Sequence, residues 1–390
     1  MDDLISSLPY NSTNYIYSLY LISPVDVDEG NACSKSQVSA VRAKRWTPLY
    51  WDGSRWYEYE GSENPNAIVI TSTNFPDANF RNWILEQDYG KDGKLTEYEI
   101  NNVTTIAVYE KNISTLEGIE YFTNLRNLYC YSNQLTSLDV STNTKLKWLY
   151  CYSNQLTSLD VSKNTALEDL RCYSNQLTSL DVSNNTALFL LYCYSNQLTS
   201  LDVSNNTALS WLYCHSNQLT SLDVSKNTAL EYFSCNSNQL TSIDLSKNTA
   251  LLFISCFDNK IRGTNMDNLI SSLPQKKSGD NKFYVISNED GNDGNVCTKT
   301  QVAVVKAKGW TPLYWDGSSS LEYEGSDDYQ YAQGDVNGDG DIGIGDIITI
   351  TNVMASNETN ADAIRRADVN GDGEVGIGDI ISITNIMAGQ

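Results

Sequence analysis

Cysteine recurs every 21 residues through the middle of this chain, and this rhythm constrains the fold more than any other feature of the sequence. A fixed period of this length indicates a solenoid, in which each repeat forms one coil and stacks on its neighbours. One coil cannot bury its own apolar side chains, so the stacked coils must share a continuous core. The seven positions are Cys130, Cys151, Cys172, Cys193, Cys214, Cys235 and Cys256.

Apolar residues within each repeat alternate with polar or aromatic ones, as Leu149 and Cys151 do in the repeat that begins at Leu146. This period of two predicts one short strand per coil, with Leu and Cys pointing inward. The unit L-x-x-L-x-C-x-x-N-Q-L resembles the leucine-rich-repeat pattern, with Cys in the third Leu position, over residues 125–262. The resemblance implies an α/β-type solenoid of 21-residue coils, with a parallel concave sheet and a cap at each end.

Three invariant positions of the repeat have predicted structural roles. The Asn that precedes Gln-Leu is expected to form a buried ladder that satisfies backbone groups where each coil turns. The Asp of each repeat is expected to cap its own turn by accepting a bond from a following backbone N–H, a cation-binding column being the alternative. The cysteines are predicted to be buried free thiols, because their parallel side chains do not face each other. The two polar columns are Asn133, Asn154, Asn175, Asn196, Asn217, Asn238 and Asn259, and Asp139, Asp160, Asp181, Asp202, Asp223 and Asp244.

Aromatic residues occupy the outward positions of the predicted strands and are the candidate ligand-binding residues. An exposed aromatic patch is typical of a binding surface, and its ligand is either a protein or a glycan. The alternative is that cross-strand aromatic pairs only stabilise the sheet. His215, the one histidine, stands where four other coils have Tyr, and no catalytic constellation can be assembled around it. The candidates are Tyr129, Tyr131, Trp148, Tyr150, Tyr152, Tyr173, Tyr192, Tyr194, Trp211 and Tyr213.

The segments that flank the repeats are predicted to cap the exposed ends of the core. Residues 63–124 form the leading cap, in which Asp88, Asp92 and Glu99 stand at the first, fifth and twelfth positions of an EF-hand-like loop. A calcium site and a plain helix-turn-helix both remain open for this loop. Residues 263–326 form the trailing cap, with a helix in KTQVAVVKAKGW and a hairpin around Asp316.

The segment at residues 1–62 repeats the sequence of the trailing cap. MDDLISSLP at residues 1–9 matches MDNLISSLP at residues 266–274. We therefore expect residues 1–62 to be a cap module from the trailing end of an earlier array, and we expect that array and a signal peptide to lie upstream of this chain.

The last segment, residues 327–390, contains two calcium-loop motifs, which begin at Asp335 and Asp368. Each places oxygen ligands at loop positions 1, 3, 5 and 12 and a backbone carbonyl at position 7, and each leads into one predicted helix. This loop-helix pair resembles the type I dockerin domain, which implies a small all-α module that binds Ca²⁺ and docks to a cohesin-type partner. Ile344, Gly345, Ile377 and Gly378 stand at loop positions 10 and 11, where dockerins carry recognition residues. The predicted ligands are Asp335, Asn337, Asp339, Asp341 and Asp346, and Asp368, Asn370, Asp372, Glu374 and Asp379.

Composition narrows the classes of function. The formal net charge of −22 makes the chain a poor candidate for nucleic-acid binding, and no run of 18 apolar residues is present to span a membrane. We expect a secreted or surface-attached, non-catalytic binding protein, extracellular or at the cell surface, that recognises a protein or glycan and docks to a scaffold. The alternatives are a component of a polysaccharide-degrading, cellulosome-like complex whose catalytic module is upstream or absent, and a structural spacer.

Overall fold

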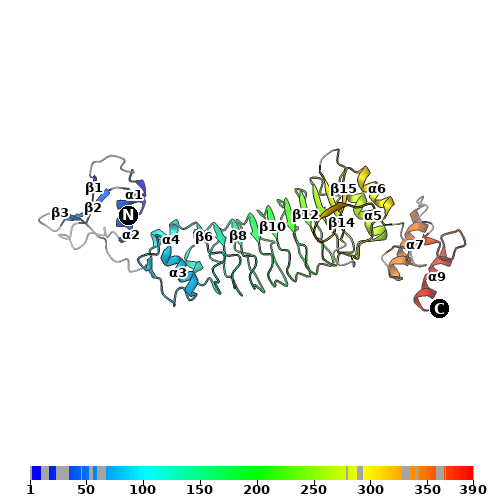
Figure 1. Ribbon diagram of the computed structural model, residues 1–390, viewed down its shortest axis with the longest axis horizontal. Coiled ribbons are helices and arrows are strands. Elements are labelled where there is room, and N and C mark those ends of the chain that lie inside the picture. Colours follow the sequence, from blue (N-terminus) through cyan, green and yellow to red (C-terminus); the bar gives the residue numbers. More distant parts are fainter. Residues whose placement is uncertain are drawn as a thin grey trace. The chain divides into compact units, whose positions relative to one another are not determined.

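A computed structural model divides the chain into two compact units, residues 1–146 and 147–390 (Figure 1). The boundary between them falls inside the predicted repeat array, whereas the sequence-based boundaries at 62, 124, 262 and 326 stay predictions. One predicted ligand, Asp339, lies outside the described residues. The structure describes residues 2–9, 17–22, 35–44, 46–51, 56–58, 67–277, 280–287, 293–326, 334–338, 341–356, 364 and 366–389.

The first unit begins with a small α/β module. Its β1 and β2 are parallel and β3 returns antiparallel to β2. Ile5, Val38 and Val41 are buried together, and the ammonium group of Lys44 donates to the carbonyls of Ile5, Ser6 and Leu8. The elements are α1 (Asp2–Ser7), β1 (Tyr17–Ile22), α2 (Lys35–Ala43), β2 (Trp46–Trp51) and β3 (Trp56–Glu58).

The rest of the first unit contains a helix-turn-helix and the first coils. Asp77 caps α3 by accepting bonds from the backbone of Asn79 and Phe80, and its second oxygen accepts from the backbone and hydroxyl of Ser114. Strands β6 and β7 pair in parallel. The elements are β4 (Ile68–Val69), α3 (Ala78–Glu86), β5 (Lys94–Leu95), α4 (Glu97–Asn102), β6 (Thr105–Ala107), η1 (Ile119–Tyr121) and β7 (Asn127–Tyr129).

The second unit contains the stacked coils, each with one short strand. Successive strands are parallel, and equivalent positions of neighbouring repeats lie side by side, as Leu190 and Trp211 do. Leu149, Cys151 and their counterparts are fully buried, which confirms the predicted inward positions. The strands are β8 (Trp148–Tyr150), β9 (Asp169–Arg171), β10 (Leu190–Tyr192), β11 (Trp211–Tyr213), β12 (Tyr232–Ser234) and β13 (Phe253–Ser255).

The predicted asparagine ladder forms in these coils and ties each coil to the one before it. The amide nitrogen of Asn175 donates to the carbonyls of Cys151, at 3.1 Å, and Cys172, at 3.0 Å. Its amide oxygen accepts from the backbone N–H of Leu156 at 3.0 Å. The same bonds recur at Asn196 in the next coil. One side chain therefore satisfies backbone groups of two coils at once.

A second column of buried asparagines was not predicted. The amide nitrogen of Asn185 donates to the carbonyls of Val161, at 3.0 Å, and Asn164, at 2.8 Å, in the preceding coil. Asn206 and Asn227 repeat these bonds. Because this Asn belongs to the Ser-x-Asn-Thr turn, each coil is bonded to its neighbour on two sides.

The remaining repeat positions behave as expected from the sequence. The seven periodic cysteines are buried free thiols, and burial raises the pKa of Cys172 and Cys214 to about 12. Each column aspartate accepts a bond from the backbone N–H two residues later, at 2.8 Å for Asp160 and Ser162. These bonds, first from the backbone and then from the hydroxyl of Ser162, hold the pKa of Asp160 below its usual value.

The segment predicted to be the trailing cap extends the parallel sheet, because β14 pairs with β13 on one side and β15 on the other. The predicted hairpin is present, since β15 and β16 are antiparallel. Lys308 donates to the carbonyls of Ser271 and Leu273, which repeats the bonds of Lys44 in the first module. The duplicated sequences thus share one fold. The elements are α5 (Gly263–Ser272), β14 (Lys282–Ser287), α6 (Lys299–Ala307), β15 (Thr311–Trp315) and β16 (Ser320–Glu322).

The described residues of the C-terminal domain include α7 (Ile344–Ser356) and α9 (Ile377–Met387). Val336, Ile350, Ala367, Val369 and Ile383 form its buried core. Met354 is exposed, whereas Val353 packs against the core. Among the described residues no helix is long and apolar enough to cross a lipid bilayer.

Replacing Asn175 by Ala should lower the free energy of unfolding by about 2–4 kcal/mol, because buried carbonyls of two coils and one N–H lose their partner. Urea unfolding followed by circular dichroism measures the change. Gln176→Ala is the matched control, since the side chain of Gln176 is exposed. Equal stability of the two variants would contradict the ladder's role.

Candidate functional site

The outward aromatic residues form columns in which each ring stacks on the ring of the next coil. The rings of Tyr152 and Tyr173 lie 4.3 Å apart, those of Tyr173 and Tyr194 4.2 Å, and those of Tyr194 and His215 4.2 Å, all nearly parallel. Tyr192 and Tyr213 stack in a second column at 4.6 Å. In the first unit, Tyr131 stacks on Tyr109 at 4.7 Å. This spacing matches the distance between neighbouring strands.

Stacking leaves most of these rings only partly exposed. Of the ten predicted ligand-binding residues, Trp148 is exposed, with 42% of its surface accessible, and the other nine are half-buried. Burial raises the pKa of Tyr173 and Tyr192 to about 12. The faces of Tyr173 and Tyr194 lie against neighbouring rings, so these two residues offer a ligand their edges and hydroxyl groups, and the stacking stabilises the sheet as well.

Two charged residues interrupt the columns at β9. The guanidinium group of Arg171 lies between the rings of Tyr150 and Tyr192, at 4.4 and 5.1 Å from their centroids. It also donates to Asp169, with its Nη2 atom 2.9 Å from Oδ2. The hydroxyl of Tyr150 donates to the same carboxylate at 2.7 Å. Asp169 is consequently buried, with both oxygens bonded.

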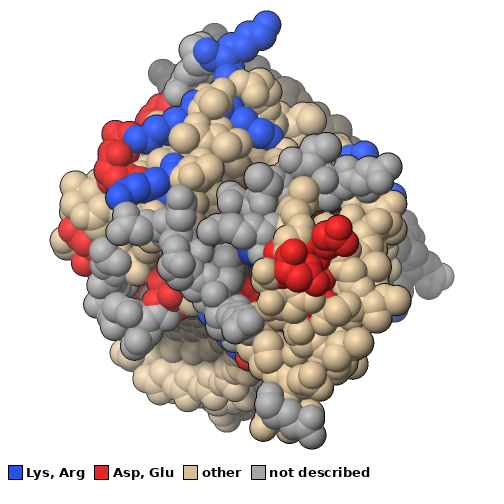
Figure 2. All heavy atoms as spheres, turned by 90° about the vertical axis from the view of Figure 1, so that its right-hand side faces the viewer, with Lys and Arg blue, Asp and Glu red and all other residues tan. Residues whose placement is uncertain are grey.

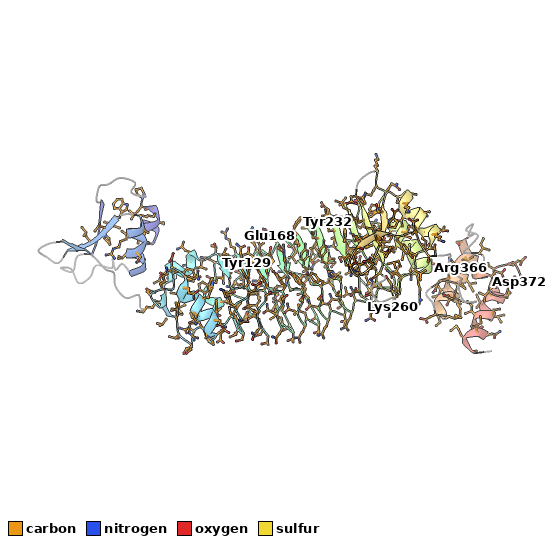
Figure 3. All side chains as sticks on the ribbon, viewed as in Figure 1. Tyr129, Glu168, Tyr232, Lys260, Arg366 and Asp372 are labelled. Carbon is orange, nitrogen blue, oxygen red and sulfur yellow. The ribbon has the colours of Figure 1, made fainter. Side chains whose placement is uncertain are left out.

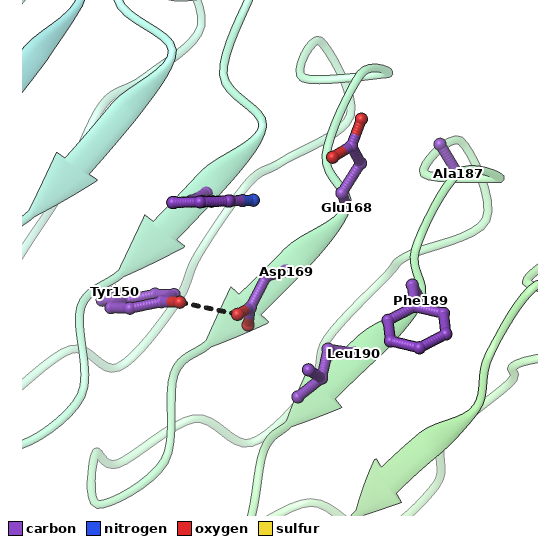
Figure 4. A pocket seen from close by; sticks show the side chains of 7 residues that line it. Tyr150, Glu168, Asp169, Ala187, Phe189 and Leu190 are labelled. Carbon is purple, nitrogen blue, oxygen red and sulfur yellow. Dashed lines mark hydrogen bonds between the residues drawn. The ribbon is translucent and has the colours of Figure 1, made fainter. Parts of the chain in front are cut away.

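A pocket of about 520 Å³ opens above Asp169 (Figure 4). It exists because Asp169 is short, while its neighbours across the sheet, Trp148 and Leu190, are large. Phe189 is 49% exposed, and Glu168 projects on the side of the coils that carries the strands (Figure 3). The lining residues are Trp148, Tyr150, Glu168, Asp169, Ala187, Phe189 and Leu190.

A compact polar cluster follows the aromatic columns at β11 to β13. The Nδ1 atom of His215 and the hydroxyl of Ser234 lie 3.2 Å apart. The amide oxygen of Asn236 accepts from the hydroxyls of Ser234 and Ser255 at 2.8 and 3.1 Å. His215 therefore continues the tyrosine stack with one ring nitrogen bonded inside the cluster, which fits a structural position.

The EF-hand-like loop lies in the helix-turn-helix of the first unit. Asp88 is exposed and forms an ion pair with Lys91, whose hydrogen bond holds the pKa of Asp88 below its usual value. Asp92 accepts from the backbone of Lys94, and Glu99 completes the capping box of α4 by accepting from the backbone and hydroxyl of the N-cap residue Thr96. Burial raises the pKa of Glu99. The three predicted ligands therefore have local partners, and calcium at this loop stays a prediction.

The two C-terminal loops hold their twelfth-position carboxylates in the same way. In the first loop, Asp346 accepts hydrogen bonds from the backbone N–H groups of Val336, at 2.7 Å, and Gly343, at 2.8 Å. In the second loop, Asp379 accepts hydrogen bonds from the backbone N–H groups of Asn370, at 3.1 Å, and Gly376, at 2.7 Å. Both carboxylates are buried at the start of a helix. The repeated sequence motif thus forms a repeated structure.

The second loop shows a feature that suits a cation. Asp368 accepts from the backbone of Gly373 with one oxygen, while its other oxygen is buried without a hydrogen-bond donor among the described residues. Asn370 and Asp372 are bonded to each other beside it. Over the described part of the chain, no three His, Cys, Asp or Glu side chains converge closely enough to hold a metal ion. The all-oxygen donor set and the unsatisfied oxygen fit Ca²⁺.

Residues 333–387 match the dockerin type I domain. The match covers both loops and both helices of the C-terminal domain, as the sequence motifs predicted. Dockerin type I domains bind calcium. At the predicted partner-binding positions of this dockerin domain, Ile344 and Ile377 are each 70% exposed, and Gly345 and Gly378 are exposed beside them.

The repeat region is similar to solved structures from Listeria monocytogenes. One is the functional domain of InlJ, described as including a cysteine ladder, which is 32% identical with a TM-score of 0.52 over 62% of this chain and 55% of that one. The internalin inlF is 25% identical with a TM-score of 0.50, over 64% of this chain and 73% of that one. The chain thus spans about half the length of the InlJ structure, and its coils form a leucine-rich-repeat solenoid of the internalin type. Among curated proteins, none matches this chain.

Sequence reasoning missed Glu168, Phe189 and Leu190 as residues of the pocket. The available signal was the short residue Asp169 between the large residues Trp148 and Leu190 of its column. Glu168 and Phe189 precede their strands and lie outside the alternating pattern, which therefore gives no signal for them.

Below pH 6.5, His215 should make the folded chain less stable. Burial lowers the pKa of His215 from 6.5 to about 4. Between pH 6.5 and 4, His215 therefore binds a proton in the unfolded state but not in the folded state. The loss begins as pH falls through 6.5, is complete below 4, and is at most about 3 kcal/mol. Urea unfolding of the wild type and of His215→Tyr between pH 7 and 4 measures it. Equal pH dependence of the two proteins would refute this prediction.

Proposed function

We propose that this chain is a non-catalytic binding subunit, extracellular or at the cell surface, whose dockerin domain docks to a cohesin-type module while the concave face takes a protein or glycan ligand. The observation that carries the proposal is the pair of matched apolar surfaces on the dockerin domain. Ile344 and Ile377 have the same exposure, and Ile348 and Ile381 are each 54% exposed one turn further along the helices. Exposed apolar patches of this kind are typical of protein interfaces.

Calcium binding supports the docking role. We propose that Asp368, Asn370, Asp372, the Glu374 carbonyl and Asp379 hold one ion, and that Asp335, Asn337, Asp339, the Asp341 carbonyl and Asp346 hold another. A bound ion would neutralise carboxylates that otherwise repel one another and would fix the loops that begin α7 and α9. Acidic side chains gather in a group on the face of the molecule shown in Figure 2.

The concave face supports a recognition role through its pocket rather than through its stacked rings. A pocket of this volume, with apolar walls and a few polar groups, is typical of a binding site. A component of a polysaccharide-degrading complex, with its catalytic module elsewhere, fits the dockerin domain equally well. A plain spacer needs no pocket, so the opening above Asp169 favours recognition.

Removing calcium should unfold the dockerin domain and leave the coils intact. With a chelator, hydrogen exchange in residues 341–356 and 366–389 should rise by at least about tenfold, while residues 147–262 keep their protection. Mass spectrometry of the full chain reports both regions in one experiment. Unchanged exchange in the two C-terminal helices would contradict the assignment.

Replacing the matched isoleucines should abolish cohesin docking in steps. Ile344→Asp or Ile377→Asp alone should weaken binding to type I cohesin modules modestly, and the double variant should lose at least about 100-fold, since each loop presents an equivalent surface. Calorimetry in calcium buffer with the full chain measures the affinity. Leu321→Asp, an exposed leucine on β16, is the matched control. A double variant that binds like the wild type would overturn the docking surface.

A further inference from the structure

We propose that the pocket above Asp169 accepts an arginine side chain of a protein ligand. This inference rests on the proposed function, namely that the concave face takes a ligand, and names the chemistry of that ligand. The pocket lies wholly within the second unit, between β8 and β10, and its walls come from three successive coils.

The shape of the pocket suits a flat group. Asp169 lies between Trp148 and Leu190 in the sheet register, so two strand spacings of about 4.8 Å separate the large neighbours. A short side chain between them leaves a slot, and a planar group that fills it lies about 4.8 Å from each wall. Trp148 and Phe189 are the exposed aromatic residues of the lining.

A guanidinium group already lies between two side chains of neighbouring coils at the next outward position of the same strand. There Arg171 places its guanidinium between Tyr150 and Tyr192, one coil to either side, and forks onto Asp169. In the neighbouring column, Asp169 is too short to fill the equivalent slot between Trp148 and Leu190. A guanidinium from outside would repeat the packing that Arg171 already shows.

The carboxylate of Glu168 gives the lining of the pocket an accessible negative charge, which favours a cation. Asp169, also in the lining, is buried, and Arg171 and Tyr150 already bond both of its oxygens. Guanidinium groups bind carboxylates in a bidentate manner and lie over aromatic faces, so one arginine could pair with Glu168 while it lies against Trp148 or Phe189. The formal net charge of −22 also attracts basic partners at long range.

Lys147 is the competitor for this site. Its ammonium group lies 2.6 Å from a Glu168 oxygen, and both side chains of the pair are about 45% exposed. An ion pair exposed to this extent is weak, so Glu168 can exchange Lys147 for an incoming guanidinium. Removing Lys147 should therefore strengthen binding, a response that a neutral ligand such as a sugar would not give.

The experiment measures binding of acetyl-Gly-Arg-Gly-amide to the full chain by calorimetry at low salt. The uncharged isostere acetyl-Gly-citrulline-Gly-amide is the control peptide. The variants are Glu168→Gln, Lys147→Gln, Trp148→Ala and Phe189→Ala. Glu231→Gln is the matched control protein, because Glu231 occupies the position of Glu168 three coils further on and lies outside the pocket.

We expect the arginine peptide to bind at least about fivefold more tightly than the citrulline peptide. Glu168→Gln should weaken binding about threefold, Lys147→Gln should strengthen it about twofold, and each aromatic variant should weaken it about fivefold or more. Glu231→Gln should bind like the wild type. Equal binding of the two peptides, or affinities unchanged in both charge variants, would overturn the proposal.

A sugar ligand would give a different pattern and would also overturn it. In that case monosaccharides would bind with sensitivity to Trp148→Ala, and neither Lys147→Gln nor the citrulline replacement would change the affinity. Cohesin docking through Ile344 and Ile377 is measured in a separate assay, so failure of the arginine site and failure of the docking function are distinguishable.

Discussion

A buried asparagine amide that bonds two coils at once is the interaction on which the rest of the structure depends. Each coil has a single short strand, so backbone groups outside the strand need other hydrogen-bond partners, and buried asparagine side chains supply many of them. Asn175 reaches the carbonyls of Cys151 and Cys172, and so fixes the spacing and register of two neighbours. That register places equivalent outward side chains side by side in columns. The rings stack within these columns, and the pocket opens where one column has a short residue.

Most of the fold could be predicted from the sequence, because it follows from local and periodic constraints. The alternation of apolar and polar residues around Leu149 and Cys151 predicted the strands, and the Asp of the repeat, followed by Ser-x-Asn-Thr, predicted the turn cap at Asp160. The column containing Asn185 was not predicted, although it repeats just as regularly. Its sequence context, Ser-x-Asn-Thr, is typical of an exposed turn, and only the stacking of the coils buries the amide.

The candidate site was predictable in part. Periodicity predicted the aromatic columns, and the stacking of Tyr173 on Tyr194 agrees with the alternative in which cross-strand aromatic pairs stabilise the sheet. The pocket depends on residues that break the repeat, since Asp169 opens the slot and Arg171 fills the one beside it. Its walls come from coils on either side, so no local window of sequence contains the site. The dockerin loops were predictable because each is a short contiguous motif.

The near identity of the coils has a consequence for how the array finds its correct alignment. A coil that stacked one unit out of step would keep almost all of its leucine, cysteine and asparagine contacts. Residues that occur once, such as Arg171 and His215, would meet the wrong neighbours. These exceptions distinguish one coil from the next, so the residues that break the repeat also specify which coil stacks on which.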